Sequence, residues 1–166
     1  MIQERAILAG GCFWGMEELI RQLPGVIGTM VGDTGGSLPN PTYSDMKSKV
    51  TGHAEAVDVI FEPSMLSCRE LLDFMFQIHD PAAKNRPGNE IGPSYRPAIF
   101  YINDAQKQET EQLIAEMSAS QKWLGTIVTE IVPAGIFRPA EDHHQVYLRR
   151  NPNGYACHYI RRGWRL

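Results

Sequence analysis

Cys12 is the residue whose position favours chemistry most clearly. It lies between a short apolar run, Arg5–Ala9, and a helical pattern, so we expect it at the junction of a strand and a helix. The first turn of a helix has unpaired backbone N–H groups that stabilise a thiolate and lower the pKa of a cysteine there. Phe13 and Trp14 follow directly and could line a pocket, or could simply be core. The residues alone leave both a nucleophilic and a structural Cys12 open.

Glu55 is the second candidate, because it shares a strand face with apolar side chains. In the strand predicted at His53–Phe61, alternation places Glu55 on the same side as Val57 and Val59. Burial disfavours a charged carboxylate and raises its pKa, so Glu55 could hold a proton near neutral pH and donate it. The alternative is a strand-end glutamate that reaches solvent or pairs with Arg96.

Tyr43 and Tyr95 could supply hydroxyl hydrogen bonds to such a site. Each lies beside a loop that contains proline. A tyrosine in such a place is often half-buried packing, so the residues alone do not decide between the two roles.

The histidines near the C-terminus raise the question of a metal. Neighbouring residues on a helix point about 100° apart, so His143 and His144 would not easily bind one ion. The chain has no CxxC motif to add to Cys157 and His158, and we expect no metal. A Cys-His acyl hydrolase using Cys12 and one of these histidines stays open, as does a peptide-binding module without catalysis.

The three cysteines are widely separated and odd in number, which argues against a disulfide framework. Cys68 begins an amphipathic helix, and we expect it to be structural. Cys157 lies in a tail from Asn151 onwards that contains glycine and proline and is expected to be mobile. Its thiol could therefore reach another sulfur.

These residues are positioned by a predicted alternation of strands and helices. Ser67 and Glu70 predict a capping box at one helix start. The order βαββαβ followed by αβα predicts an α/β (α+β) two-layer sandwich: a ferredoxin-like core with a mixed sheet, extra helices and an irregular C-terminal tail. We expect strands at Arg5–Ala9, Val26–Val31, His53–Phe61, Tyr95–Ile102 and Thr126–Val132, helices at 16–23, 67–78 and 103–122, a last helix after Pro139 that runs to about Arg150, and a helical turn at 42–47.

The composition predicts one domain over residues 1–166, with a tail at 151–166. With 166 residues, of which 43% are apolar, the chain can bury a core without staples. A net charge of -3 favours neither nucleic acid nor an anionic membrane. No apolar run approaches the ~20 residues of a membrane span, or the pattern of an export signal. We therefore expect a cytoplasmic protein that works as a monomer.

Several short motifs surround these candidate residues. They are GCFWG at Gly11–Gly15, NPTY at Asn40–Tyr43, GHAEAV at Gly52–Val57, HDP at His79–Pro81 and YRPAIFY at Tyr95–Tyr101. Taken together, the motifs closely resemble the peptide methionine sulfoxide reductase A family. The resemblance implies an enzyme that reduces the S-epimer of methionine sulfoxide, free or in peptides and proteins. It implies no metal or flavin, and thioredoxin as the reductant.

The resemblance also implies roles for single residues. Cys12 would attack the sulfoxide sulfur, and Glu55 would give the oxygen its proton. Cys157 would then condense with the resulting sulfenic acid to form a disulfide. Tyr43 and Tyr95 would donate hydrogen bonds to the oxygen, while Phe13 and Trp14 hold the substrate's ε-methyl group.

Three positions depart from the family pattern. Asp33 stands in GDTGG, where many relatives have tyrosine. Glu90 replaces the usual aspartate of a GND segment; it keeps the charge, and we expect it to contact the substrate. Cys157 is the only cysteine of the tail, where other members have two or none.

Overall fold

The computed structural model describes residues 3–10, 13–34, 54–78, 97–120, 129–135 and 137–151. In these residues, no helix has the length and apolar character needed to cross a membrane. The elements are β1 (Glu4–Ala9), α1 (Phe13–Ile20), β2 (Val26–Thr34), β3 (Ala54–Phe61), α3 (Cys68–Ile78), β4 (Ala98–Tyr101), α4 (Asp104–Ser120), β5 (Glu130–Pro133), β6 (Arg138–Pro139), a 3-10 helix (Asp142–His144) and α5 (Tyr147–Arg150).

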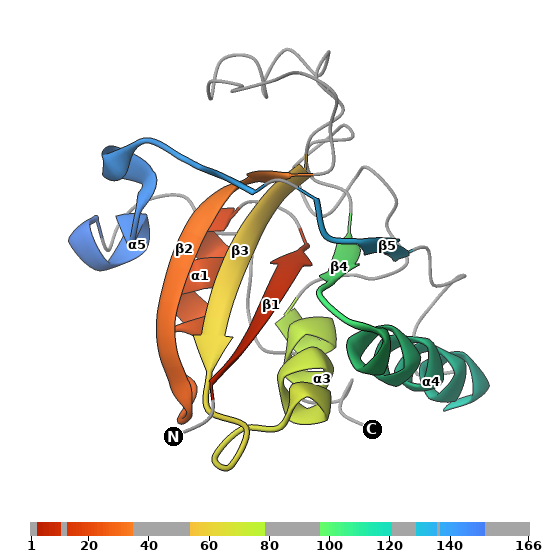
Figure 1. Ribbon diagram of the computed structural model, residues 1–166. Coiled ribbons are helices and arrows are strands. Elements are labelled where there is room, and N and C mark those ends of the chain that lie inside the picture. The colour runs from red at the N-terminus through yellow and green to blue at the C-terminus, as the bar shows by residue number, and fades with distance from the viewer. Residues whose placement is uncertain are drawn as a thin grey trace.

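One six-stranded sheet organises the chain, in the order β5-β4-β1-β3-β2-β6 (Figure 1). Its four central strands pair antiparallel, and the order β4-β1-β3-β2 is that of the split-βαβ core. β5 adds a parallel edge beside β4, so the sheet is mixed. The predicted fold class is therefore confirmed.

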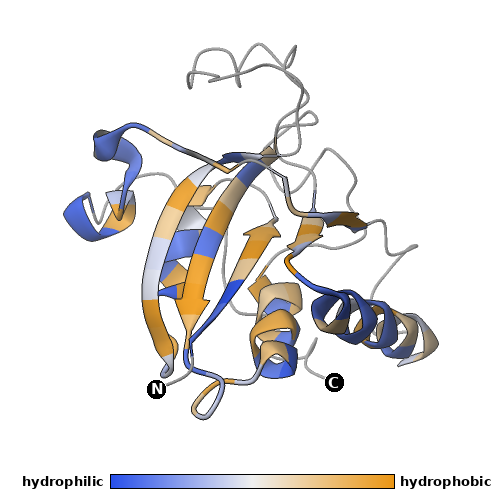
Figure 2. Cartoon of the chain, viewed as in Figure 1, coloured by the Kyte–Doolittle hydropathy of each residue, from blue (hydrophilic) through white to orange (hydrophobic). Residues whose placement is uncertain are grey.

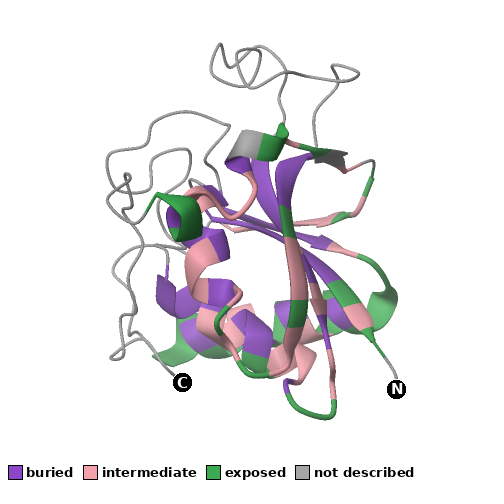
Figure 3. Cartoon of the chain, turned by 90° about the vertical axis from the view of Figure 1, so that its left-hand side faces the viewer, coloured by how far each residue is buried: buried purple, intermediate pink, exposed green. Residues whose placement is uncertain are grey.

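The sheet has two unequal apolar faces. Val57, Val59 and Phe61 of β3 belong to the main core, together with the inner sides of α1, α3 and α4. Ala54 and Ala56 point to the opposite face, where a smaller cluster includes Phe100. Figures 2 and 3 show apolar, buried residues along the strands, whereas α4 is largely hydrophilic outside. The helices thus cover one face, as in a two-layer sandwich.

The predicted helix starts have the expected capping geometry. Ser67 Oγ accepts from the Glu70 amide, and Glu70 Oε1 accepts from the Ser67 amide, both at 3.0 Å. This reciprocal pair confirms the capping box. At α4, Asn103 Oδ1 accepts from the Gln106 amide at 2.9 Å. These local bonds satisfy backbone donors that have no partner within the helix.

The strand bounds differ from the prediction in extent. β2 continues through Gly32 to Thr34, because these polar residues pair with β3 instead of facing solvent. β4 ends at Tyr101, since the amide of Ile102 donates to the Gln106 side chain of the next helix. The predicted turn at 42–47 lies outside the described residues, as do the outer ends of several predicted elements.

The prediction of a single helix from the residue after Pro139 to about Arg150 is wrong, because a 3-10 helix and a short α-helix stand there instead. Pro139 belongs to β6, which pairs with β2, and Val146, with φ of 44° in the left-handed region, separates the 3-10 helix from α5. Gln145 explains the break. Its side chain accepts from the Val31 amide at 2.9 Å and donates to the Val31 carbonyl at 2.9 Å, so it continues the edge of β2 where β6 ends.

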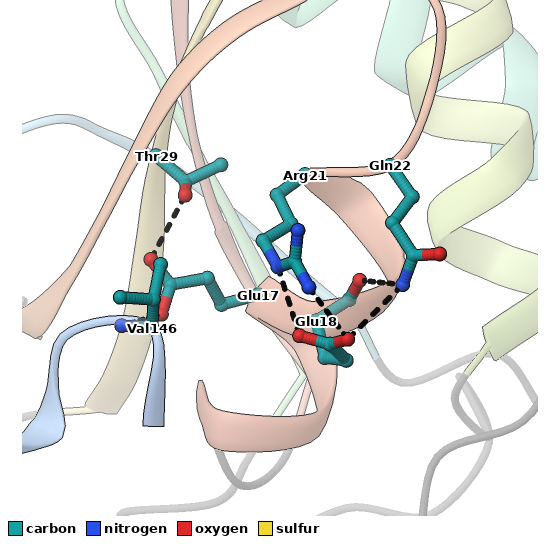
Figure 4. A network of polar contacts seen from close by, with 6 residues as sticks. All are labelled: Glu17, Glu18, Arg21, Gln22, Thr29 and Val146. Atoms are coloured by element: carbon teal, nitrogen blue, oxygen red, sulfur yellow. Dashed lines mark hydrogen bonds and ion pairs between the residues drawn. The ribbon is translucent and has the colours of Figure 1, made fainter. Parts of the chain in front are cut away.

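Glu17 anchors this C-terminal segment, residues 138–151, to α1 and β2 (Figure 4). The carboxylate is 1% exposed; it accepts from Thr29 Oγ1 at 2.8 Å and from the Val146 amide at 2.7 Å. Burial raises the pKa of Glu17, while these two hydrogen bonds act in the opposite direction. Glu17 thereby satisfies the backbone at the left-handed residue and joins three elements.

We predict that Glu17→Ala lowers the free energy of unfolding by about 3 kcal/mol, because two hydrogen bonds to a buried carboxyl are lost and the partly buried Val146 amide loses its acceptor. Glu17→Gln should cost less, since its amide oxygen still accepts from Val146. Urea unfolding measures both. Glu18→Gln is the matched control: Glu18 pairs with Arg21 at 2.7 Å near the surface and should change the stability by less than about 1 kcal/mol.

The pH dependence gives a second readout for Glu17. Folding raises the pKa of Glu17. The contribution of Glu17 to the free energy of unfolding is therefore complete below about pH 4.5, and it declines as the pH rises through the pKa of Glu17 in the folded protein. The difference in stability between the parent and Glu17→Gln should therefore shrink with rising pH. A difference that grows with pH would contradict this assignment.

Candidate functional site

Three of the expected site residues lie in the described part of the chain: Phe13, Trp14 and Glu55. They come together at the start of α1, over the beginning of β3. The other five expected residues, Cys12, Tyr43, Glu90, Tyr95 and Cys157, lie outside the described residues.

Glu55 contacts the start of α1 directly. Its Oε1 accepts a buried hydrogen bond from the amide of Phe13 at 3.2 Å, and its side chain is 1% exposed. The Phe13 amide nitrogen belongs to the peptide bond that joins Cys12 to Phe13. The predicted position on the apolar face is confirmed, and the carboxyl contacts the backbone one residue from the candidate nucleophile.

Asp33 is a second buried carboxyl at this end of the sheet. It pairs in register with Glu55 on one side and with Arg138 on the other. Asp33 is 4% exposed, and its Oδ1 is buried without a hydrogen-bond partner. Burial, with a smaller contribution from the charge of Glu141, raises the pKa of Asp33 to about 7. The site therefore contains a carboxyl that ionises near neutral pH.

Trp14 is held by the C-terminal segment. Its ring stacks on Tyr147 at 3.9 Å between centroids and 11° between planes, and its Nε1 donates to His144 Nδ1 at 3.1 Å. Phe13 is 1% exposed and belongs to the main core, with its ring centroid 5.6 Å from that of His144. Phe13 is therefore a core residue, whereas Trp14 is half-buried in an aromatic cluster.

His144 accepts a hydrogen bond within this aromatic cluster. Because Nδ1 accepts from Trp14, the imidazole is neutral with its proton on Nε2, which lies 3.5 Å from a Glu141 oxygen. A base that accepts a proton from Cys12 would need a free acceptor nitrogen, so this geometry disfavours His144 as the base of a hydrolase. In the described residues, no group of three His, Cys, Asp or Glu side chains could hold a metal ion.

Cys68 differs from what a reactive thiol requires. Burial, assisted by Glu4 and Glu109, raises the pKa of Cys68 to about 12, so the thiol stays protonated at neutral pH. It is a free cysteine at the start of α3. This supports a structural role.

Sequence reasoning missed Glu17 and Tyr147. Glu17 could have been noticed, because it lies four residues after Phe13 and three before Ile20, on the apolar stripe of the helix. No local signal pointed to Tyr147, since its contact with Trp14 joins residues 133 positions apart in sequence, the difference between 147 and 14.

Comparison with known proteins agrees with the motifs. The family model described as peptide methionine sulfoxide reductase matches residues 4–164. Peptide methionine sulfoxide reductase MsrA of Mycolicibacterium paratuberculosis is 56% identical over 163 residues, which cover 98% of this chain and 93% of that protein.

Solved structures show the same fold. Mxr1 from Saccharomyces cerevisiae in reduced form superposes with a TM-score of 0.89 at 36% identity, covering 96% of this chain and 92% of Mxr1. Mxr1 in complex with Trx2 gives a TM-score of 0.66 at 29% identity, covering 96% of this chain and 90% of that chain. With a family match over nearly its whole length, the chain belongs to the peptide methionine sulfoxide reductase family.

Proposed function

We propose that this enzyme reduces the S-epimer of methionine sulfoxide, free or in peptides and proteins, with Cys12 as nucleophile and Glu55 as general acid. The observation that carries the assignment is the buried hydrogen bond from the Phe13 amide to Glu55. It brings a desolvated carboxyl to the peptide bond that follows Cys12. A thiolate and a proton donor are the two groups that sulfoxide reduction requires.

The chemistry balances with these groups. The Cys12 thiolate attacks the sulfoxide sulfur, whose oxygen is a poor leaving group until it is protonated. Glu55 supplies that proton; the oxygen passes to Cys12 as a sulfenic acid, and methionine leaves as a thioether. Cys157 then condenses with the sulfenic acid, which releases water and forms the Cys12–Cys157 disulfide.

The aromatic residues orient the substrate in this proposal. The Trp14 ring, fixed by Tyr147 and His144, offers a rigid apolar surface to the substrate's ε-methyl group, and Phe13 supports it from the core. Tyr43 and Tyr95 are assigned as hydroxyl donors to the sulfoxide oxygen, and Glu90 as a substrate contact. These three assignments rest on the family motifs.

The reductant in this proposal is thioredoxin, and no metal or flavin takes part, because the thiols carry both electrons. The related Mxr1 structure in complex with Trx2 supports such a partner. We propose further that residues 1–166 form one catalytic domain that acts as a monomer in the cytoplasm. A reducing compartment would keep the disulfide transient.

We predict that Cys12→Ser abolishes methionine formation from the S-sulfoxide with dithiothreitol, because a hydroxyl is not a comparable nucleophile at neutral pH. Product analysis by chromatography measures this. Cys68→Ser is the matched control and should retain activity, since the Cys68 thiol is protonated and structural. Activity that survives in Cys12→Ser would rule out the proposed nucleophile.

Glu55→Gln should slow sulfenic acid formation at neutral pH by about 100-fold or more, because an amide cannot donate the required proton. Single-turnover kinetics with excess enzyme isolate this step. Glu62→Gln, just beyond the end of the same strand, is the control and should match the parent. An unchanged rate in Glu55→Gln would remove Glu55 from the role of acid.

Cys157→Ser should retain turnover with dithiothreitol but lose it with thioredoxin, because the protein disulfide cannot form. A thiol count before and after adding one equivalent of substrate without reductant tests the same step. The parent should lose two thiols per chain and form methionine. Equal thioredoxin-supported rates in parent and variant would show that the reductant attacks the sulfenic acid directly. If the parent binds methionine peptides but forms no product, a binding module is favoured instead.

A further inference from the structure

Asp33 and Glu55 stand opposite each other where β2 and β3 pair. Directly opposed residues of an antiparallel pair point to the same face, with their Cβ atoms about 4.5–5.5 Å apart. The preceding pair on this face, Val31 and Val57, packs in the main core. The two carboxyls therefore both lie on the side of the sheet that α1 covers.

Neither carboxyl has ready access to water. Asp33 is 4% exposed and Glu55 is 1% exposed, and Asp33 Oδ1 makes no hydrogen bond. A buried carboxylate with an unsatisfied oxygen is costly, and the cost falls when the carboxyl takes up a proton. Two buried carboxyls side by side favour a state in which at least one of them is protonated.

The charges of the described side chains near the pair do not remove this constraint. Glu141 opposes ionisation of Asp33, and His144 is neutral. On β6, the backbone of Arg138 is in register with Asp33. In the described residues, Glu17 of α1 and His144 of the 3-10 helix are buried on these elements, and Glu141 precedes that helix. Glu18 of α1 and Asp142 of the 3-10 helix are more exposed, and Asp58 of β3 lies on the opposite face of the strand.

Glu55 is subject to a conflict that its neighbour can resolve. The Phe13 amide and the positive end of α1 favour a charged carboxylate. The proposed reaction needs the opposite, a protonated acid, at the moment when the sulfoxide oxygen requires its proton. A negative charge next to Glu55 acts against the helix start and favours the acid form.

We propose that Asp33 is a positioning residue for the catalytic proton: it shares one proton with Glu55 and thereby keeps Glu55 protonated at neutral pH. The inference rests on the proposed role of Glu55. The proton moves from Glu55 to the sulfoxide oxygen, which leaves both carboxyls charged. The pair then takes up one proton from solvent before the next turnover.

The test is the pH profile of single-turnover sulfenic acid formation with methionine S-sulfoxide. In Asp33→Asn, the midpoint of the alkaline decline should move to lower pH by about one unit, which is a loss of about 10-fold in rate at pH values well above both midpoints. Below the decline the rate should match the parent within about two-fold. Damage to packing alone would lower the rate at every pH and leave the midpoint unchanged.

Two controls keep the result specific. Asp58→Asn removes a carboxyl from the other face of β3, where it pairs with Arg5 at 2.8 Å, and should leave the midpoint in place. Asp33→Ser repeats the test with a smaller neutral side chain.

Infrared spectroscopy at pH 7 tests the pair without turnover, because a protonated carboxyl has its own C=O band. This band should weaken in Asp33→Asn and disappear in the double variant Asp33→Asn with Glu55→Gln.

Different results would overturn the shared proton, the role of Glu55 and the proposed reaction. A midpoint that stays or rises in both Asp33 variants, with an unchanged infrared band, would overturn the shared proton. An alkaline decline that persists in Glu55→Gln would overturn the role of Glu55 itself. A parent enzyme that forms no sulfenic acid would overturn the proposed chemistry as a whole.

Discussion

The hydrogen bond from the Phe13 amide to Glu55 is the contact on which the arrangement of the site depends. It fixes the first residue of α1 over the first residues of β3, in a buried position where a lost bond would be costly. Met16 and Ile20 then pack on the sheet from the same helix. The position of the helix start, and with it the residues on either side, follows from the way α1 lies against the central strands.

The C-terminal segment completes this arrangement with side chains that replace backbone partners. Gln145 hydrogen-bonds both the amide and the carbonyl of Val31, as a neighbouring strand would. Glu17 accepts a hydrogen bond from the amide of Val146. The left-handed backbone conformation of Val146 is uncommon for a β-branched residue. Tyr147, directly after this left-handed residue, stacks on the ring of Trp14. One aromatic surface of the site is thus built by residues from opposite ends of the chain.

Three buried carboxyls on the α1 side of the sheet give the site its electrostatic character. Glu17 has partners for both oxygens and serves the architecture. Asp33 has a buried oxygen with none, and stands beside Glu55 in the register. Local conflicts of this kind are expected where function competes with stability, because a carboxyl kept short of hydrogen bonds is easier to protonate. Glu17 therefore stabilises the fold through its hydrogen bonds, whereas Asp33, which has fewer, is the carboxyl that is easier to protonate.

Local patterns were sufficient for the order of the elements, the capping box at Ser67 and the apolar face that carries Glu55. Each depends on residues close together in sequence, so periodicity and capping rules apply. The motifs likewise indicate the family, because each is a short contiguous stretch of sequence. The segment after Pro139 does not form the single predicted helix, because the side chains of Glu17 and Gln145, bonded across the fold, outweigh the local helical preference.

The neighbours of the site residues were decided by tertiary structure. In sequence, Asp33 was only a departure from a family motif, and Glu17 only one of two adjacent glutamates. The register of β2 against β3 placed Asp33 opposite Glu55, and the packing of α1 buried Glu17 while Glu18 stayed near the surface. The sequence by itself determined the fold class, the family and the candidate acid. Which charges share a buried environment depends on long-range pairing, because burial and register do not exist until distant segments meet.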